Sequence, residues 1–305
     1  MRDMRKKIRK NNNTLPLYLM LIPATVVLIV FAYIPLVGIK IAFEDFIPAK
    51  GLFGKQEFIG FENFKYALML PSFWNIVGNT VFIAGAKLIL GLVFAVGMSL
   101  LLNELPLNRY RKTIQSIIYL PHFISWVVLA GIFNSMLSPT NGVVNRILES
   151  MGLESVYFLG DKKIFPWAMI FTDCWKELGF STIVYLAAMA GIDPQQYDAA
   201  KLDGASRWMV MRHITLPGIS HIIVLMALLS VGNIFNAGFD QIYNMYSPQV
   251  YETGDVLDTL IYRLGLIESQ YGVSAAVGLM KSAITGLLIG LFYFIAYKAV
   301  DYRIF

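Results

Sequence analysis

Six long apolar stretches run through this chain of 305 residues, and each is long enough to form a helix that crosses a lipid bilayer. A spanning helix needs about 20 mostly apolar residues. Inside a bilayer every peptide group must be hydrogen-bonded within the protein, which favours helices. The sequence therefore predicts an all-α fold, a polytopic membrane bundle of six transmembrane helices. The expected spans are Leu17–Phe43, Phe73–Leu102, Ile114–Leu137, Ile164–Ile192, Ile219–Phe239 and Val273–Val300.

The composition excludes several other classes of protein. Hydrophobic residues make up 57% of the chain and charged residues 15%, whereas soluble domains average about 45–50% and about 25%. A single cysteine, Cys174, excludes a disulfide framework and a cysteine metal cluster. His122 and His213 lack partners at ligand spacing, so no metal site is expected. The cations lie beside apolar spans and form no basic face with interleaved aromatic residues, which argues against nucleic-acid binding.

The distribution of lysine and arginine predicts the orientation in the membrane. Positive residues gather on the cytoplasmic side of membrane proteins. The N-terminal tail, the segments after the second and fourth spans and the C-terminal end together hold fourteen cations and six acids. The segments Glu44–Ser72, Ser138–Lys163 and Asp240–Gly272 hold seven cations and twelve acids. We therefore expect a multi-pass protein of the cytoplasmic (inner) membrane with both termini cytoplasmic. The first span is too long for a cleaved signal peptide, and no small-residue cleavage site follows it.

The cytoplasmic segment between the fourth and fifth spans has a readable local structure. Asp193 can cap a helix whose first residue is Pro194. Gly204 allows a turn that a residue with a Cβ atom resists. We expect a second short helix over Ala205–His213, at an angle to the first.

The same segment carries a motif with nine matching positions. These are Asp198-Ala199-Ala200, Asp203-Gly204-Ala205, Ile214 and Leu216-Pro217. The pattern resembles the EAA loop of binding-protein-dependent ABC importer permeases. Asp198 departs from the glutamate that is usual in that family, which shortens the acid by one methylene group. The chain also lacks the large periplasmic insertion that some members carry after an early span.

Further stretches resemble the carbohydrate permeases of the maltose-transporter type. They are Tyr119–Trp126, Gly142, Asn145, Trp175-Lys176, Gly179, Phe239–Tyr243, Asp258-Thr259 and Tyr271–Ala276. Within this group the sequence is most similar to permeases for oligosaccharide fragments of polysaccharides. The resemblance covers the chain from about Leu17 to the C-terminus and implies the fold of a type I ABC importer permease.

The resemblance also implies the partners. The short helix before Gly204 would be a coupling helix that docks on a separate cytoplasmic ATPase, with Asp198 near a basic group and the alanines allowing close approach. Two copies of that ATPase, a second and different permease subunit, an extracytoplasmic solute-binding protein and an oligosaccharide complete the system. The chain has no phosphate-binding loop. We therefore expect no catalytic residue and no bound cofactor, since ATP and Mg²⁺ are used by the partner ATPase.

The resemblance divides the chain into three parts. Residues 1–43 are a cytoplasmic basic tail with the first transmembrane helix, and residues 44–72 are an extracytoplasmic loop, read from its glycines as an irregular or hairpin-like cap. Residues 73–305 are the permease core, with the coupling loop at 193–217.

Polar side chains at membrane depth are candidates for a translocation path. Asp173, Lys176 and Glu177 share one helical face through their i, i+3, i+4 spacing. They either compensate one another's charge or line a water-filled path for sugar hydroxyls, and Trp175 either stacks on a sugar or packs. In the fifth span and just beyond it, Asn233, Asn236 and Asp240 share a face, and they either bond between helices or line the path. Asn79, Lys87 and Lys281 are weaker candidates.

Three rival functions stay open at this stage. An ABC permease for another cargo, such as amino acids or metal chelates, would use the same loop. An ion-coupled secondary transporter could use Asp173, Lys176 and Glu177 as a relay but leaves the loop from Asp198 to Pro217 unexplained. An intramembrane enzyme lacks a nucleophile–base pair or a metal constellation.

Overall fold

A computed structural model describes residues 15–105, 108–232 and 235–300. The basic tail and Asn233 lie outside the described residues. The long helices are α1 (Leu15–Leu28), α3 (Phe73–Asn103), α7 (Phe165–Ala190), α10 (Leu216–Val231) and α14 (Tyr271–Val300), with α4 (Asn108–Tyr119) and α5 (Trp126–Met136) as shorter ones. The remaining helices are α2 (Glu62–Met69), α6 (Val143–Ser150), α8 (Pro194–Leu202), α9 (Arg207–Val210), α11 (Phe239–Met245), α12 (Tyr251–Gly254) and α13 (Leu257–Tyr262).

The predicted all-α membrane bundle is confirmed, but the predicted count of six spans is not. Among the described residues, four helical segments are long and apolar enough to cross a membrane: Tyr18–Phe43, Phe73–Asn103, Arg207–Val231 and Tyr271–Ile295. The pair Arg109–Phe123 and Trp126–Met136 counts as a fifth only as a bent span. The remaining predicted span corresponds to α7, which carries the three charged residues Asp173, Lys176 and Glu177.

Two of the predicted spans are interrupted. The third turns through 103° between Phe123 and Trp126, after a 3₁₀ turn that contains Pro121, and the Ser125 side chain caps the new helix α5. The fifth begins earlier than predicted, at Arg207, and stops at Val231. The next described helix, α11, begins after Gly238, whose φ of +91° suits a residue without a Cβ atom.

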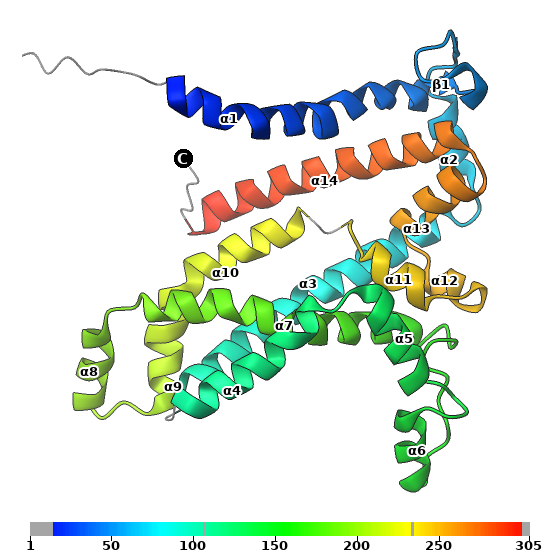
Figure 1. Cartoon of the computed structure of the whole chain (residues 1–305). Coiled ribbons are helices and arrows are strands. Elements are labelled where there is room, and N and C mark those ends of the chain that lie inside the picture. Colours follow the sequence, from blue (N-terminus) through cyan, green and yellow to red (C-terminus); the bar gives the residue numbers. More distant parts are fainter. Residues whose placement is uncertain (1–14, 106–107, 233–234, 301–305) are drawn as a thin grey trace, which may run out of the picture.

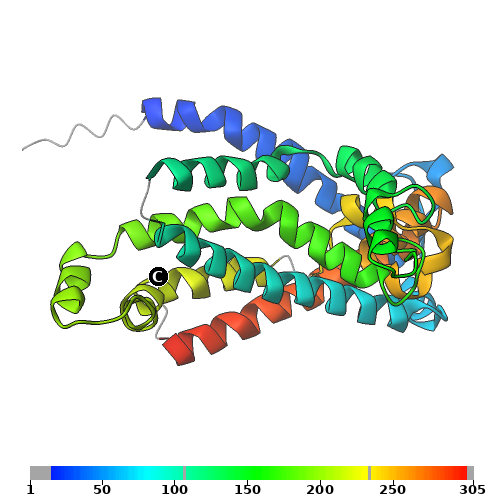
Figure 2. The same ribbon diagram turned by 90° about the horizontal axis from the view of Figure 1, so that it is seen from below.

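The two ends of the helical bundle differ in structure (Figures 1 and 2). The start of α1, the end of α14, and α8 with α9 lie at one end of the bundle, here called the α8 end. The opposite end, here called the β1 end, holds α2, α5, α6, α11, α12 and a two-stranded hairpin. In the hairpin, β1 (Glu44–Asp45) pairs antiparallel with β2 (Glu57–Phe58). A short strand pair is thus present in the segment for which the glycines predict an irregular or hairpin-like cap.

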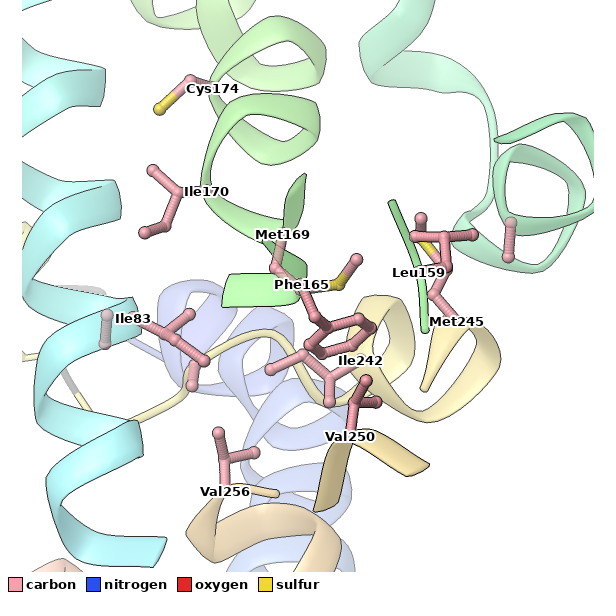
Figure 3. Close-up of a cluster of buried hydrophobic side chains, with 13 residues drawn as sticks. Ile83, Leu159, Phe165, Met169, Ile170, Cys174, Ile242, Met245, Val250 and Val256 are labelled. Carbon is pink, nitrogen blue, oxygen red and sulfur yellow. The ribbon is translucent and has the colours of Figure 1, made fainter. Parts of the chain in front are cut away.

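The buried side chains form three clusters along the bundle. One cluster at the β1 end gathers Ile83 of α3, Phe165 and Met169 of α7 and Ile242 of α11 around one another (Figure 3). The helices α3 and α7 share the most extensive contact in the structure.

The close approach of α7 to α4 depends on a small residue. A Cβ atom at Gly179 of α7 would lie 2.0 Å from the carbonyl oxygen of Ile118 in α4. Such small-residue contacts are how helices associate in lipid, where apolar burial adds little.

Candidate functional site

The segment between α7 and α10 folds largely as its sequence predicts. The Asp193 side chain accepts a hydrogen bond of 2.9 Å from the backbone N–H of Gln195, and Pro194 begins α8. Gly204 has a φ of +73°, as the expected turn requires. The predicted second helix, Ala205–His213, is present but its bounds differ: it begins at Arg207 as α9 and does not end at His213, because it continues through a π-helical turn into α10. Ser206, which the sequence analysis did not single out, caps α9 by accepting from the Met209 N–H.

Most of the motif residues are exposed at the α8 end. Asp198, Ala199, Asp203 and Gly204 are exposed, while Ala200 and Ala205 are half-buried. Leu202 at the end of α8 is 90% exposed. Asp198 forms an ion pair of 3.3 Å with Lys201 on the same helix. The motif therefore presents an exposed surface that is acidic and partly apolar.

The end of the motif lies apart from that surface. Leu216 and Pro217 follow the π-helical turn Met211–Thr215 and open α10. Tyr197 of α8 reaches Thr215 through a contact of 3.2 Å between their hydroxyl oxygens, which ties the two parts together.

A polar groove lies between α3, α7 and α10. It consists of two adjoining cavities of about 490 and about 130 Å³. Lys87, Asp173, Glu177, Ser181 and Ser230 line both cavities. The groove therefore brings charged side chains and hydroxyl groups together between the helices α3, α7 and α10.

Lys87 of α3 is the centre of a hydrogen-bond network at one end of the groove. Its Nζ atom donates to the carbonyl oxygen of Ala237 at 2.8 Å and to the Gln241 side chain, and it lies 3.4 Å from Asp173 Oδ1. Gln241 is fully buried and donates in turn to the Met169 carbonyl and the Thr172 hydroxyl, both at 2.8 Å. The network thus joins α3, α7 and α11.

A second network surrounds Glu177. Lys176 Nζ donates to the carbonyl oxygen of His122 at 2.7 Å and lies 3.2 Å from Glu177 Oε1. Glu177 Oε2 lies 2.8 Å from His122 Nδ1, and the His122 ring stacks on Phe180 with centroids 4.2 Å apart. Asp173 is therefore compensated by Lys87 of another helix, whereas Lys176 compensates Glu177.

The structure brings together only some of the predicted path residues. Asp173, Glu177 and Asn236 line the groove, but Lys176, Trp175, Asn79 and Asp240 are not among the lining residues. Trp175 packs edge-on against Phe133. Asn79 donates to the backbone carbonyls of Glu252 and Asp255, which fastens α3 to the β1 end. Asp240 is exposed in the first turn of α11.

Asn236 belongs to a third polar cluster next to the groove. Lys281 Nζ of α14 donates to Asn236 Oδ1 at 2.7 Å and also bonds to Asp258 of α13. The residues that follow α10 are thus held by a lysine from α14 as well as by Lys87 from α3.

Sequence reasoning missed part of the groove although a signal was present. Asp173, Glu177 and Ser181 recur at i, i+4 and i+8, which places them in one stripe along α7. Ser181 and Ser230 were not singled out because isolated serines in apolar spans are common. Among the described residues no group of three or more His, Cys, Asp or Glu side chains could hold a metal ion.

Comparisons with known proteins agree with this architecture. The family described as "Binding-protein-dependent transport system inner membrane component" matches residues 87–305. "Protein LplB" of Bacillus subtilis (strain 168) is 38% identical over 90% of this chain and 86% of its own length. The "Polygalacturonan/rhamnogalacturonan transport system permease protein YteP" of the same organism is 36% identical over 90% and 85%.

A solved structure superposes on nearly the whole chain. One chain of a bacterial ABC transporter involved in the import of the acidic polysaccharide alginate is 36% identical, with a TM-score of 0.87. The superposition covers 94% of this chain and 96% of that one. On the family match over residues 87–305 and on these relatives, this chain belongs to the binding-protein-dependent inner membrane components, the permease subunits of ABC importers.

Proposed function

We propose that this chain is one of two permease subunits of an ATP-driven importer for oligosaccharides. The near full-length superposition on the alginate importer carries the proposal. The name of YteP, which is similar over most of its length, supports a carbohydrate cargo as well. The family match favours an importer over the secondary transporter and the intramembrane enzyme, because the matched family is described as a component of a binding-protein-dependent transport system.

The α8 surface is the proposed docking site for that ATPase. The exposed Asp198, Ala199 and Leu202 project from a helix whose end is fixed by the turn at Gly204. Two ATPase copies would bind the two permease subunits. ATP and Mg²⁺ would bind to the ATPase subunits and not to this chain. In the division into 1–43, 44–72 and 73–305, the third part then carries both the groove and the coupling loop at 193–217.

The α8 end is proposed to face the cytoplasm and the β1 end the solute-binding protein. The two ends lie apart along the bundle (Figure 1), and the asymmetry of cations along the sequence supports this orientation. Lys55→Cys, in an exposed loop at the β1 end, should react with an impermeant thiol reagent in intact cells. Lys201→Cys on α8 should react only after lysis. Labelling of Lys201→Cys in intact cells would reverse the orientation.

The groove is proposed to form this subunit's half of the translocation path. Glu177 is 38% exposed at its side chain, so water can solvate the groups that its substitution leaves unpaired. We expect Glu177→Gln to leave the yield of the complex and its basal ATPase activity unchanged and to lower oligosaccharide uptake about tenfold, because a hydrogen bond to a charged group contributes about 1.5–3 kcal/mol. The measurements are complex yield, ATPase rate and uptake of labelled sugar into proteoliposomes.

The matched control is Glu149→Gln, on exposed α6, which should behave like the wild type in all three measurements. A yield that falls in proportion to uptake would contradict the path and identify the Glu177 network as structural.

A further inference from the structure

A second polar hollow lies at the β1 end, separate from the groove. Its volume is about 290 Å³. The polar lining residues come from the end of α5, from the stretch before α7 and from the end of α11; they are Asn134, Ser138, Tyr157, Asn244, Tyr246 and Ser247. Ligand pockets for whole drug-sized molecules begin at about 300 Å³. The hollow is therefore large enough for a single small ring and too small for a whole oligosaccharide.

The polar groups of this hollow are neutral. Two carboxamides, two hydroxyls and two phenols face it, and none of its described lining residues is an acid or a base. Burial raises the pKa of Tyr246, and the neighbouring Tyr251 raises it further, so the phenol keeps its proton. Carboxamides and hydroxyls both donate and accept hydrogen bonds. Such groups can bind the hydroxyl groups of a sugar ring, which also both donate and accept. A tyrosine ring can pack flat against the C–H face of the sugar ring.

One lining group has an unmet hydrogen bond. The Ser247 Oγ atom is buried and has no hydrogen-bond partner among the described residues. Buried polar atoms without partners are rare in folded proteins, and each one calls for an explanation. The Asn244 amide donates only to the Asp240 carbonyl at 2.7 Å, which leaves its own oxygen available. Among the lining residues, Asn134 and Tyr157 are exposed and define the rim of the hollow, whereas Asn244 and Ser247 are half-buried.

The helix α11 connects this hollow with the groove. Gln241, in the first turn of α11, accepts a hydrogen bond from Lys87 at the end of the groove. The hollow is lined by Asn244 near the end of α11 and by Tyr246 and Ser247 just beyond it. The helix packs against α5, whose last residues form the opposite wall. The hollow thus lies next to the groove at the β1 end, where the proposed solute-binding protein would release its cargo.

We infer that this hollow is a docking subsite for one sugar ring of the transported oligosaccharide, occupied before the sugar reaches the groove. The inference rests on the proposed function. It assigns to Asn134, Asn244 and Ser247 a role in sugar binding that is distinct from ATPase coupling and from the groove.

A protection experiment measures binding without transport. Asn134→Cys places a thiol at the rim, and the only native cysteine, Cys174, is buried. The assembled complex is labelled with an impermeant maleimide in the presence and absence of maltotriose, arabinotriose or trigalacturonate. We expect the sugar that the wild type transports to slow labelling about 3- to 10-fold. Asn141→Cys, exposed in the next loop and outside the hollow, should show no protection.

A second variant tests the role of the subsite in transport. Asn244→Ala should raise the sugar concentration for half-maximal uptake about 3- to 10-fold, as expected for the loss of one or two hydrogen bonds. Asn141→Ala is the control. Wild-type uptake of none of the three sugars would overturn the proposed function and this inference together. Wild-type uptake with no protection of Asn134→Cys and a normal Asn244→Ala variant would overturn the inference alone.

Discussion

Replacement of Lys87 by Met is expected to lower the stability of the folded chain by about 3–5 kcal/mol, the cost of breaking a buried ion pair. The Lys87 side chain is only 9% exposed. Its loss leaves the Asp173 carboxylate, the Gln241 amide oxygen and the Ala237 carbonyl without their shared donor. The bonds that link the Lys87 side chain of α3 to α7 and α11 are lost, whereas Gln241 still joins α11 to α7.

The melting temperature and the yield of the purified complex measure this effect. Lys112→Met, an exposed position on α4, is the matched control and should match the wild type. Adding Asp173→Leu to Lys87→Met removes the unpaired charge and should recover part of the lost stability, since a buried pair can often be replaced by apolar groups. If Lys87→Met melts at the temperature of the control, the network makes no net contribution.

Replacement of Gly204 by Leu is expected to abolish most of the stimulation of the ATPase by the loaded binding protein. The φ of +73° costs a residue with a Cβ atom about 1–2 kcal/mol, so the turn after α8 would shift. A Cβ atom at Gly204 meets nothing within 4 Å, so the fold of the chain itself should survive. The effect should therefore fall on the contact with the ATPase.

The measurements are co-purification of the ATPase and its turnover in the assembled complex. Gly204→Asn serves as the control, because asparagine tolerates the left-handed conformation; it should retain more stimulation than Gly204→Ala, although Ala is smaller. Normal co-purification and stimulation for Gly204→Leu would exclude this turn from coupling.

The straight helices could be predicted closely from apolar length. The predicted span Phe73–Leu102 corresponds to α3, Phe73–Asn103, and the predicted span Ile164–Ile192 to α7, Phe165–Ala190. The bend after Phe123 could not be found in this way. Side chains in contact with lipid stay apolar whether a helix continues or turns, so hydrophobicity does not record the direction of the chain.

The groove was predicted only in part, for a different reason. Helical spacing correctly places Asp173 and Glu177 on one stripe of α7, because that relation is local. The partner of Asp173 is Lys87, which lies 86 residues earlier on another helix. No local pattern gives that pairing, which depends on how α3 packs against α7. The hollow at the β1 end likewise combines residues 134–139 and 157–159 with residues 244–247, which are remote from the other two segments in the sequence.

The two lysines around the end of α10 have a mechanical consequence. Lys87 from α3 holds Ala237 and Gln241, while Lys281 from α14 holds Asn236 and Asp258. A change in the separation of α3 and α14 therefore pulls on residues 236–241 from two directions at the same time. Hydrogen bonds weaken steeply as their angles depart from linearity. A displacement of α3 relative to α14 therefore requires at least one of these two sets of bonds to change its geometry or to break.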